Sequence, residues 1–236
     1  MCGRFCNATT SDMVKATFKV HFPLGSGGRD HTAGPRGHNA EPQWNVAPSL
    51  DVETITASSE PDRHQLGVMR WGIATPQNTR PLINARSETM FEKPTFREAA
   101  YTRRCLVVAS GWYEWSAPKK PYYISRADAA PMGMAGLYWN HGDERHCVIV
   151  TTAADGDLAQ LHHRAPLVLE GDAVSPWLQG ETDYDDLMRI IRPTPSERFA
   201  WHPVTAEVGS TRVSHEGLIK PDPDHGAQPE PQLRLF

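Results

Sequence analysis

The sequence predicts an α+β fold: a single domain built on a curved, mostly antiparallel, barrel-like sheet flanked by several helices. Three observations lead to this prediction. Candidate strands outnumber candidate helices, and the two do not alternate regularly as they do around a parallel sheet. Hydrophobic residues make up 39% of the 236 residues, which is enough to fill a proper core. The chain also contains no internal repeat.

Apolar runs, alternating or continuous, mark the strands. They are expected at residues 51–57, 66–74, 105–109, 121–125, 132–139, 146–152 and 167–169. Helices are expected at residues 11–20, 94–104, 154–163, 173–178 and 184–191. A Ser or Asp cap opens the first helix, and Pro94 lies near the first turn of the second. Glycine, proline and polar residues from Leu24 to Pro42 predict a loop.

The folded domain is expected to span residues 1–220, followed by a disordered tail at 221–236 that is rich in proline, aspartate and glutamine. The N-terminus lacks the apolar stretch of a secretory signal, and no apolar run approaches the ~20 residues that cross a bilayer. Four unevenly spread cysteines do not form a disulfide framework. We therefore expect a reduced, cytoplasmic, soluble monomer that binds no metal, cofactor or membrane.

The charge balance gives a mixed indication about partners. A net charge of −4 argues against a protein that coats DNA non-specifically. The cationic residues are mainly arginine, 18 Arg against 6 Lys, and arginine binds phosphate in a bidentate manner and stacks on bases. Genomic base composition explains the arginine bias equally well, so charge alone does not identify the partner.

Cys2 is the residue with the most distinctive potential chemistry. Removal of Met1 would leave an α-amine and a thiol on adjacent carbons. Near pH 7, roughly a tenth of an α-amine is the nucleophilic free base, against under a thousandth for lysine. Such an amine forms a Schiff base with an aldehyde, and the thiol can then close a five-membered thiazolidine. Ring closure is intramolecular, where effective molarities reach ~10⁵ M or more.

Polar residues in four other segments could support this chemistry. Asn84 and Arg86 lie two residues apart, and Glu114 is placed among aromatic residues directly after a strand. A buried carboxylate can act as a general acid or base. His162 lies in a His-His-Arg run, and a Trp-His-Pro-Val segment at 201–204 lies near the end of the folded part. Taken singly, each residue has an ordinary explanation in a turn, an ion pair or the surface.

Together, these segments closely resemble one family, the SOS response-associated peptidase (SRAP) or abasic-site processing proteins, over residues 2 to 220. The matching motifs are Cys-Gly-Arg-Phe at 2–5, Asn-Val-Ala-Pro at 45–48, Trp-Gly at 71–72, Asn-Ala-Arg at 84–86, Arg-Cys-Leu-Val at 104–107, Gly-Trp-Tyr-Glu-Trp at 111–115, Pro-Tyr at 121–122, Ala-Gly-Leu at 135–137, Thr-Thr-Ala-Ala at 151–154, His-His-Arg-Ala-Pro at 162–166 and Val-Gly at 208–209. Their order and spacing make the resemblance specific.

The resemblance implies a function and a set of catalytic residues. Cys2 joins C1′ of a ring-opened abasic deoxyribose in single-stranded DNA as a thiazolidine, which shields the lesion. Asn84 holds the adduct, Glu114 helps to open the sugar or moves protons at the amine, and His162 acts as acid or base on the ring oxygen. Weak lyase activity is an expected side reaction, and the peptidase name would refer to release of Met1 or of the cross-linked protein.

The resemblance also implies a set of DNA contacts. Arg4, Arg86 and Arg164 would hold phosphates, with Thr151 nearby. Pro48 would lie where the strand is bent at the lesion. This chain departs from the common pattern in the loop at residues 74–80, which has no aromatic residue, so base stacking by that loop is in doubt. It also has Ala165 where the family usually has methionine, which we interpret as a packing change.

Three other functions fit parts of the sequence. Class II glutamine amidotransferases also begin Met-Cys-Gly, and in such an enzyme Asn84 could lie in an oxyanion hole. A direct assay of glutamine hydrolysis distinguishes this function from abasic-site processing. A metal-binding module using Cys2, Cys6 and nearby histidines is weakly supported, because Cys-x₃-Cys lacks a second close pair. A DNA-binding protein without chemistry would be unaffected by Cys2→Ala.

The C-terminal pentapeptide suggests a protein partner. It resembles the Gln-Leu-x-Leu-Phe peptide by which bacterial repair proteins dock on the replication sliding clamp, and its key residues are Gln232, Leu233, Leu235 and Phe236. A short apolar peptide on a flexible tether would raise the local concentration of the protein at replication forks, in association with the nucleoid. An apolar terminus that packs on its own domain is the alternative.

Overall fold

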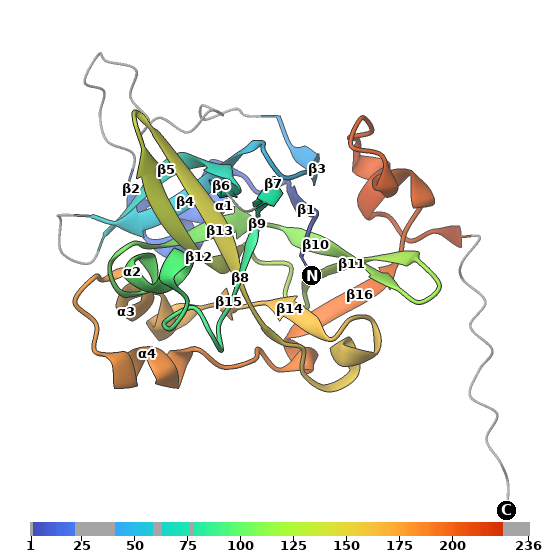
Figure 1. The fold of residues 1–236 in the computed structure, drawn as a ribbon. Helices are drawn as coiled ribbons and strands as arrows, with labels where there is room; N and C mark the ends of the chain where they lie inside the picture. The colour runs from blue at the N-terminus through green and yellow to red at the C-terminus, as the bar shows by residue number, and fades with distance from the viewer. Residues whose placement is uncertain (1, 22–40, 59–62, 76–77, 224–236) are drawn as a thin grey trace, which may run out of the picture.

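The computed structural model describes residues 2–21, 41–58, 63–75 and 78–223 (Figure 1). The predicted loop at Leu24–Pro42 and the C-terminal peptide fall largely or wholly outside these residues, so both remain expectations. In the described residues, no helix is long and apolar enough to cross a membrane.

A closed barrel forms the centre of the molecule. Its strands are β5 (His64–Trp71), β4 (Asp51–Ala57), β9 (Arg104–Ala109), β12 (Met132–His141) and β13 (Glu144–Ala153), hydrogen-bonded antiparallel in this order. The ring closes where β13 pairs with β5 in parallel, with His146 opposite Arg70 and Cys147 opposite Trp71. Closure removes the exposed strand edges that an open sheet would present. The predicted curved, mostly antiparallel sheet is confirmed.

A second sheet lies against the barrel. It is antiparallel throughout and has the order β16 (Phe199–Pro203), β11 (Lys120–Arg126), β10 (Gly111–Ser116), β1 (Phe5–Asn7) and β3 (Gln43–Val46). The shorter strands are β2 (Val20–His21), β6 (Ile73–Thr75), β7 (Asn78–Leu82), β8 (Asn84–Arg86), β14 (Arg164–Pro166) and β15 (Val168–Leu169). Of these, β8 and β14 both pair with the end of β13, which extends the barrel towards the N-terminus of the chain.

The helices flank the barrel, as expected for this fold class. They are α1 (Ser11–Phe18), α2 (Pro94–Thr102), α3 (Val174–Leu178) and α4 (Tyr184–Ile190), and Figure 1 shows the last three gathered on one side. The described part also has 3₁₀ turns at Gly156–Gln160, Gly171–Ala173, Ser196–Arg198, Ala206–Gly209 and Glu216–Ile219. The cap of α1 is Thr10, whose side chain accepts from the backbone of Met13, rather than the expected Ser or Asp.

Two sequence predictions differ from the structure because of glycine. The helix expected at 154–163 is only a short 3₁₀ turn, since Gly156 has a φ of +47°, outside the right-handed helical region. The strand expected at 66–74 is divided into β5 and β6 at Gly72, whose φ is +117°. Pro81 and Ile83 approach the position that a Cβ would take at Gly72, so the turn needs a glycine for space as well.

The central strand β9 explains how two cores share one sheet. Its residues are all buried and point alternately to the two faces. Leu106 and Val108 pack with helical residues, whereas Cys105 and Val107 join the core that contains Cys2. The continuous apolar run of β9 is therefore explained by a strand that is buried on both faces.

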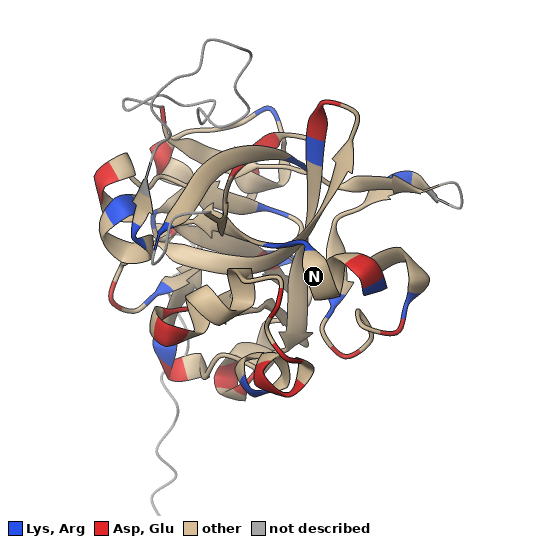
Figure 2. Ribbon diagram, turned by 90° about the vertical axis from the view of Figure 1, so that its left-hand side faces the viewer, with Lys and Arg blue, Asp and Glu red and all other residues tan. Residues whose placement is uncertain are grey.

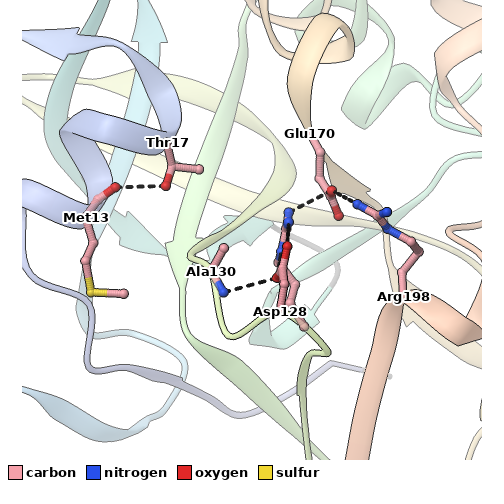
Figure 3. A network of polar contacts seen from close by, with 7 residues as sticks. Met13, Thr17, Asp128, Ala130, Glu170 and Arg198 are labelled. Atoms are coloured by element: carbon pink, nitrogen blue, oxygen red, sulfur yellow. Dashed lines mark hydrogen bonds and ion pairs between the residues drawn. The ribbon is translucent and has the colours of Figure 1, made fainter.

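An ion-pair network fastens the end of β11 to the segments before α3 and β16. Arg126 donates to Asp128 at 2.8 Å and contacts Glu170 at 2.8 Å, and Arg198 reaches the same Glu170 carboxylate (Figure 3). The Asp128 carboxylate also accepts from the backbone of Ala130. Arg126 and Glu170 are mostly buried and Asp128 is half-exposed, so the network holds these loop segments together at the edge of the barrel.

Candidate functional site

Cys2 is fully buried at the junction of the two sheets. The chain passes from it into β1, where Phe5 lies opposite Trp112 and the backbone of Tyr113 donates to Arg4. Burial raises the pKa of the Cys2 thiol well above its usual range, and the negative charge of Glu114 raises it further. The thiol is therefore neutral in this state, and its position is fixed by the first strand.

Asn84 reaches Cys2 from the other sheet. It begins β8, which runs parallel to β13 with Asn84 opposite Ile149. Its amide nitrogen donates to the Cys2 carbonyl at 2.9 Å. Its buried Oδ1 has no hydrogen-bond partner among the described residues. One end of this amide thus anchors the N-terminus, while the other offers an acceptor inside the site.

Glu114 and His162 face each other on the remaining side. Glu114 lies on β10 and is 5% exposed, and its Oε2 is 3.9 Å from Nδ1 of His162. The backbone of Arg164 contacts the same Nδ1 through its N–H at 3.0 Å and through its carbonyl oxygen at 3.2 Å, which fixes the orientation of the ring. The structure therefore brings together the four predicted catalytic residues: Cys2, Asn84, Glu114 and His162.

The predicted DNA-contacting residues divide into two groups. The first lies where β8, β13 and β14 meet. Arg86 is exposed there and lies opposite the buried Thr151. Arg164 is 8% exposed and binds Glu88 through two parallel hydrogen bonds of 2.5 and 2.9 Å, and it also donates to the Thr151 carbonyl. The hydrogen bonds from Arg164 lower the pKa of Glu88, which favours its charged form.

The second group lies on the N-terminal strand side. Arg4 is half-buried and donates to Asn45 Oδ1 at 2.8 Å and to the Val208 carbonyl at 2.9 Å. The Asn45 amide in turn donates to the carbonyls of Ser210 and Val213. Pro48 is half-buried in the turn after β3. Glu88 and Asn45 were not predicted, although both fall in or beside quoted motifs, because neither residue type signals which arginine it will hold.

The charges of the molecule are otherwise interspersed. Figure 2 shows basic and acidic segments mixed over the fold rather than separated into one basic face. The mixture fits the net charge of −4. The cations near Cys2 are therefore a local set within a fold of mixed charge.

The fold and site define a class: an α+β barrel protein whose buried second residue is a cysteine held by an amide, with an acid and a histidine beside it. Residues 1–211 match the family model described as SOS response associated peptidase (SRAP), and the chain belongs to this family.

Named relatives cover nearly the whole chain. It is 34% identical to the abasic site processing protein YedK of Escherichia coli, over 94% of this chain and 100% of that protein. It is 30% identical to YoqW of Bacillus subtilis, also named an abasic site processing protein, over 93% of this chain and 99% of that protein. A solved phage-related protein of Bordetella bronchiseptica has a TM-score of 0.67 and 28% identity, covering 86% of this chain and 94% of that one.

Proposed function

We propose that this protein senses abasic sites in single-stranded DNA and joins them covalently through Cys2 after Met1 is removed. The observation that carries the proposal is the anchoring of Cys2 by Asn84, with Glu114 and His162 facing it. The names of the relatives support abasic-site DNA as the target. The covalent link shields the exposed lesion from nucleases and error-prone bypass.

The chemistry balances without any external reagent. The free α-amine of Cys2 adds to the C1′ aldehyde of the ring-opened deoxyribose, and water leaves to give an imine. The thiol then adds to the imine carbon, and its proton moves to the nitrogen, which closes the thiazolidine. Burial favours the protonated form of the Cys2 thiol, so ring closure requires that its proton be transferred as the sulfur attacks the imine carbon. A competing β-elimination from the imine would account for weak lyase activity.

Each neighbouring residue has a distinct task in this scheme. Asn84 holds the N-terminal residue and the adduct by hydrogen bonds. Glu114 moves protons at the amine or helps to open the sugar. His162 acts as acid or base on the sugar ring oxygen, and the Arg164 backbone holds its ring in place at Nδ1.

The flanking strand would be held by the cations around the site. Arg86 is exposed and available to a phosphate, whereas Arg4 and Arg164 are already hydrogen-bonded within the protein. Arg4 and Arg164 would contact phosphates through the guanidinium N–H groups that do not bind Asn45 or Glu88. Thr151 and Pro48 would shape the path of the strand. We also propose that the protein acts as a monomer in the cytoplasm, at replication forks. Residues 1–220 would form its functional domain.

A cross-linking assay tests the function. The purified protein is mixed with a labelled single strand that carries one abasic site, and the products are separated on a denaturing gel beside Cys2→Ala. We expect a shifted band only for the wild type and only on abasic DNA. If mass spectrometry shows that Met1 is removed and no band forms, the proposal is wrong, and glutamine hydrolysis becomes the activity to measure.

The alternative of a zinc module through Cys2 and Cys6 finds no support in their positions. Cys2 belongs to the core with Trp71, whereas Cys6 points into a separate cluster with Tyr113, and its sulfur accepts from Ser110 at 3.2 Å. Two cysteines that face different cores do not share one tetrahedral ion.

We further propose that the C-terminal peptide binds the sliding clamp through Gln232, Leu233, Leu235 and Phe236. Its support is the match to the docking motif in the sequence. Deletion of residues 232–236 should abolish retention by immobilised clamp in a pull-down and leave cross-linking unchanged. Equal retention of the truncated protein would refute the proposal.

A further inference from the structure

His163 is an exposed histidine at the edge of the site. It follows His162, and the two imidazole rings lie 4.3 Å apart between centroids at an angle of 31°. The ring therefore covers one face of His162 while its own outer face is open to solvent. No step of the proposed chemistry uses it.

The groups around His163 are mainly cationic. His162 lowers the pKa of His163 below its ordinary value, with smaller contributions from slight burial, the N-terminal amine, Arg164 and Arg86. The charge of Arg164 is largely balanced by Glu88, and Glu114 lies behind His162. Among the described residues no ion pair involves Arg86, so its charge is not balanced by a carboxylate within 4.0 Å. An anion bound at His163 would therefore also be attracted by the charge of Arg86.

We propose that His163 is a phosphate-binding residue for the strand next to the lesion, and that it takes up a proton when the strand binds. The inference rests on the proposed function in placing a single strand at this site. A phosphodiester near His163 would compensate the repulsion from its cationic neighbours and favour the imidazolium, which donates from both ring nitrogens. DNA binding is then tighter at lower pH, because the bound state holds one more proton.

Binding must be measured without cross-linking to test this linkage. A fluorescent single strand carrying a tetrahydrofuran abasic analogue has no aldehyde, so anisotropy at constant ionic strength reports only reversible binding. For the wild type we expect the dissociation constant to fall by about three- to ten-fold from pH 8 to pH 5.5, which corresponds to an average uptake of about 0.2 to 0.4 proton over this range. His163→Asn should lose most of this change.

Two further variants make the test specific. His163→Arg carries a permanent charge, so it should bind at pH 8 as tightly as the wild type does at pH 5.5, with a flattened pH profile. His141→Asn removes another exposed histidine, at the end of β12, and should keep the wild-type profile. The exposed position of His163 means that neither substitution at it disturbs the core.

The outcomes separate this inference from the proposed function. If the wild type cross-links an abasic strand but His163→Asn and His163→Arg show its unaltered pH profile, the role of His163 is refuted while the proposed function stands. If the wild type fails to cross-link and binds no strand at any pH, the proposed function fails first. A profile flattened by both His163 substitutions and not by His141→Asn supports the inference.

Discussion

Two buried polar clusters on opposite sides of β9 illustrate different uses of polar burial. Arg104 is 2% exposed and donates to the carbonyls of Ala100, Tyr101, Trp177 and Gln179, which ties the ends of α2 and α3 to the barrel. Burial lowers the pKa of Arg104 to about 10, still well above neutrality, so it remains charged. Every contact of this cluster serves the fold.

The cluster at Cys2 is arranged differently. Asn84 uses its amide nitrogen on the Cys2 carbonyl, but its buried Oδ1 has no partner among the described residues. Glu114 Oε2 lies 3.9 Å from His162 Nδ1, and that nitrogen is also in contact with the Arg164 backbone. Buried polar groups normally have their hydrogen bonds made, and exceptions concentrate at functional sites. The comparison teaches that the buried donors of Arg104 are matched by carbonyl oxygens, whereas the Asn84 amide beside Cys2 keeps one buried acceptor that the described residues do not match.

The largest change should come from Glu114. Glu114→Gln keeps the shape of the side chain and removes its ability to carry a proton. We expect cross-linking to slow by roughly 10²- to 10⁴-fold, with little effect on the thermal midpoint. Rates come from quenched time points on denaturing gels. A variant that cross-links at the wild-type rate would contradict the assignment of the Cys2 cluster to function.

Arg104 should show the reverse pattern. Arg104→Met leaves several carbonyls without a donor, and we expect a loss of about 3 kcal/mol or more in the free energy of unfolding by urea. The folded fraction should cross-link as the wild type does.

Arg103→Met is the matched control for this loss. Arg103 pairs with the exposed Glu98 and donates to the Tyr138 carbonyl at 3.3 Å, so its removal should cost clearly less than the removal of Arg104, which binds four carbonyls. Equal losses for both variants would show that the Arg104 cluster has no special structural role.

The smallest effect concerns Glu88, which belongs to the rim of the site. Arg164 lowers its pKa, so the pair contributes stability above the unfolded pKa of a glutamate, and this is lost as the pH falls through the lower folded value. Glu88 is 49% exposed, and solvent screening limits the contribution to below about 1 kcal/mol. Urea unfolding at pH 6 and pH 3 should show a smaller acid loss for Glu88→Gln than for the wild type. An identical loss of stability in Glu88→Gln and the wild type would show that the Arg164–Glu88 pair does not contribute to the pH dependence of stability.

Local sequence patterns predicted the elements whose pattern is long and regular. The strand at 51–57 matches β4, and α2 begins at Pro94 as expected. By contrast, β8 was not predicted, because Asn84-Ala85-Arg86 has no apolar alternation and is held as a strand only by its register with β13. The aromatic run of β10 was also missed as a strand for lack of alternation.

The arrangement of the candidate site was also beyond what local sequence patterns can predict. The residue types at Cys2, Asn84, Glu114 and His162 were identified through chemistry and resemblance. Their convergence depends on non-local pairing, since Glu114 and His162 are 48 positions apart on β10 and beside β14. Periodicity carries no information about such contacts. The Glu88 partner of Arg164, 76 positions away, could be found only from the fold.

The most direct test of the central claim compares Cys2→Ser with the wild type and Cys2→Ala on a labelled abasic strand. Serine is also a small second residue, so Met1 removal should leave its α-amine free while the thiol is lost. The account predicts a gel-stable adduct for the wild type and none for Cys2→Ala. Cys2→Ser should give an adduct only after borohydride reduction of the imine. A heat-stable adduct from unreduced Cys2→Ser, with Met1 removal verified by mass spectrometry, would contradict thiazolidine closure by the Cys2 thiol.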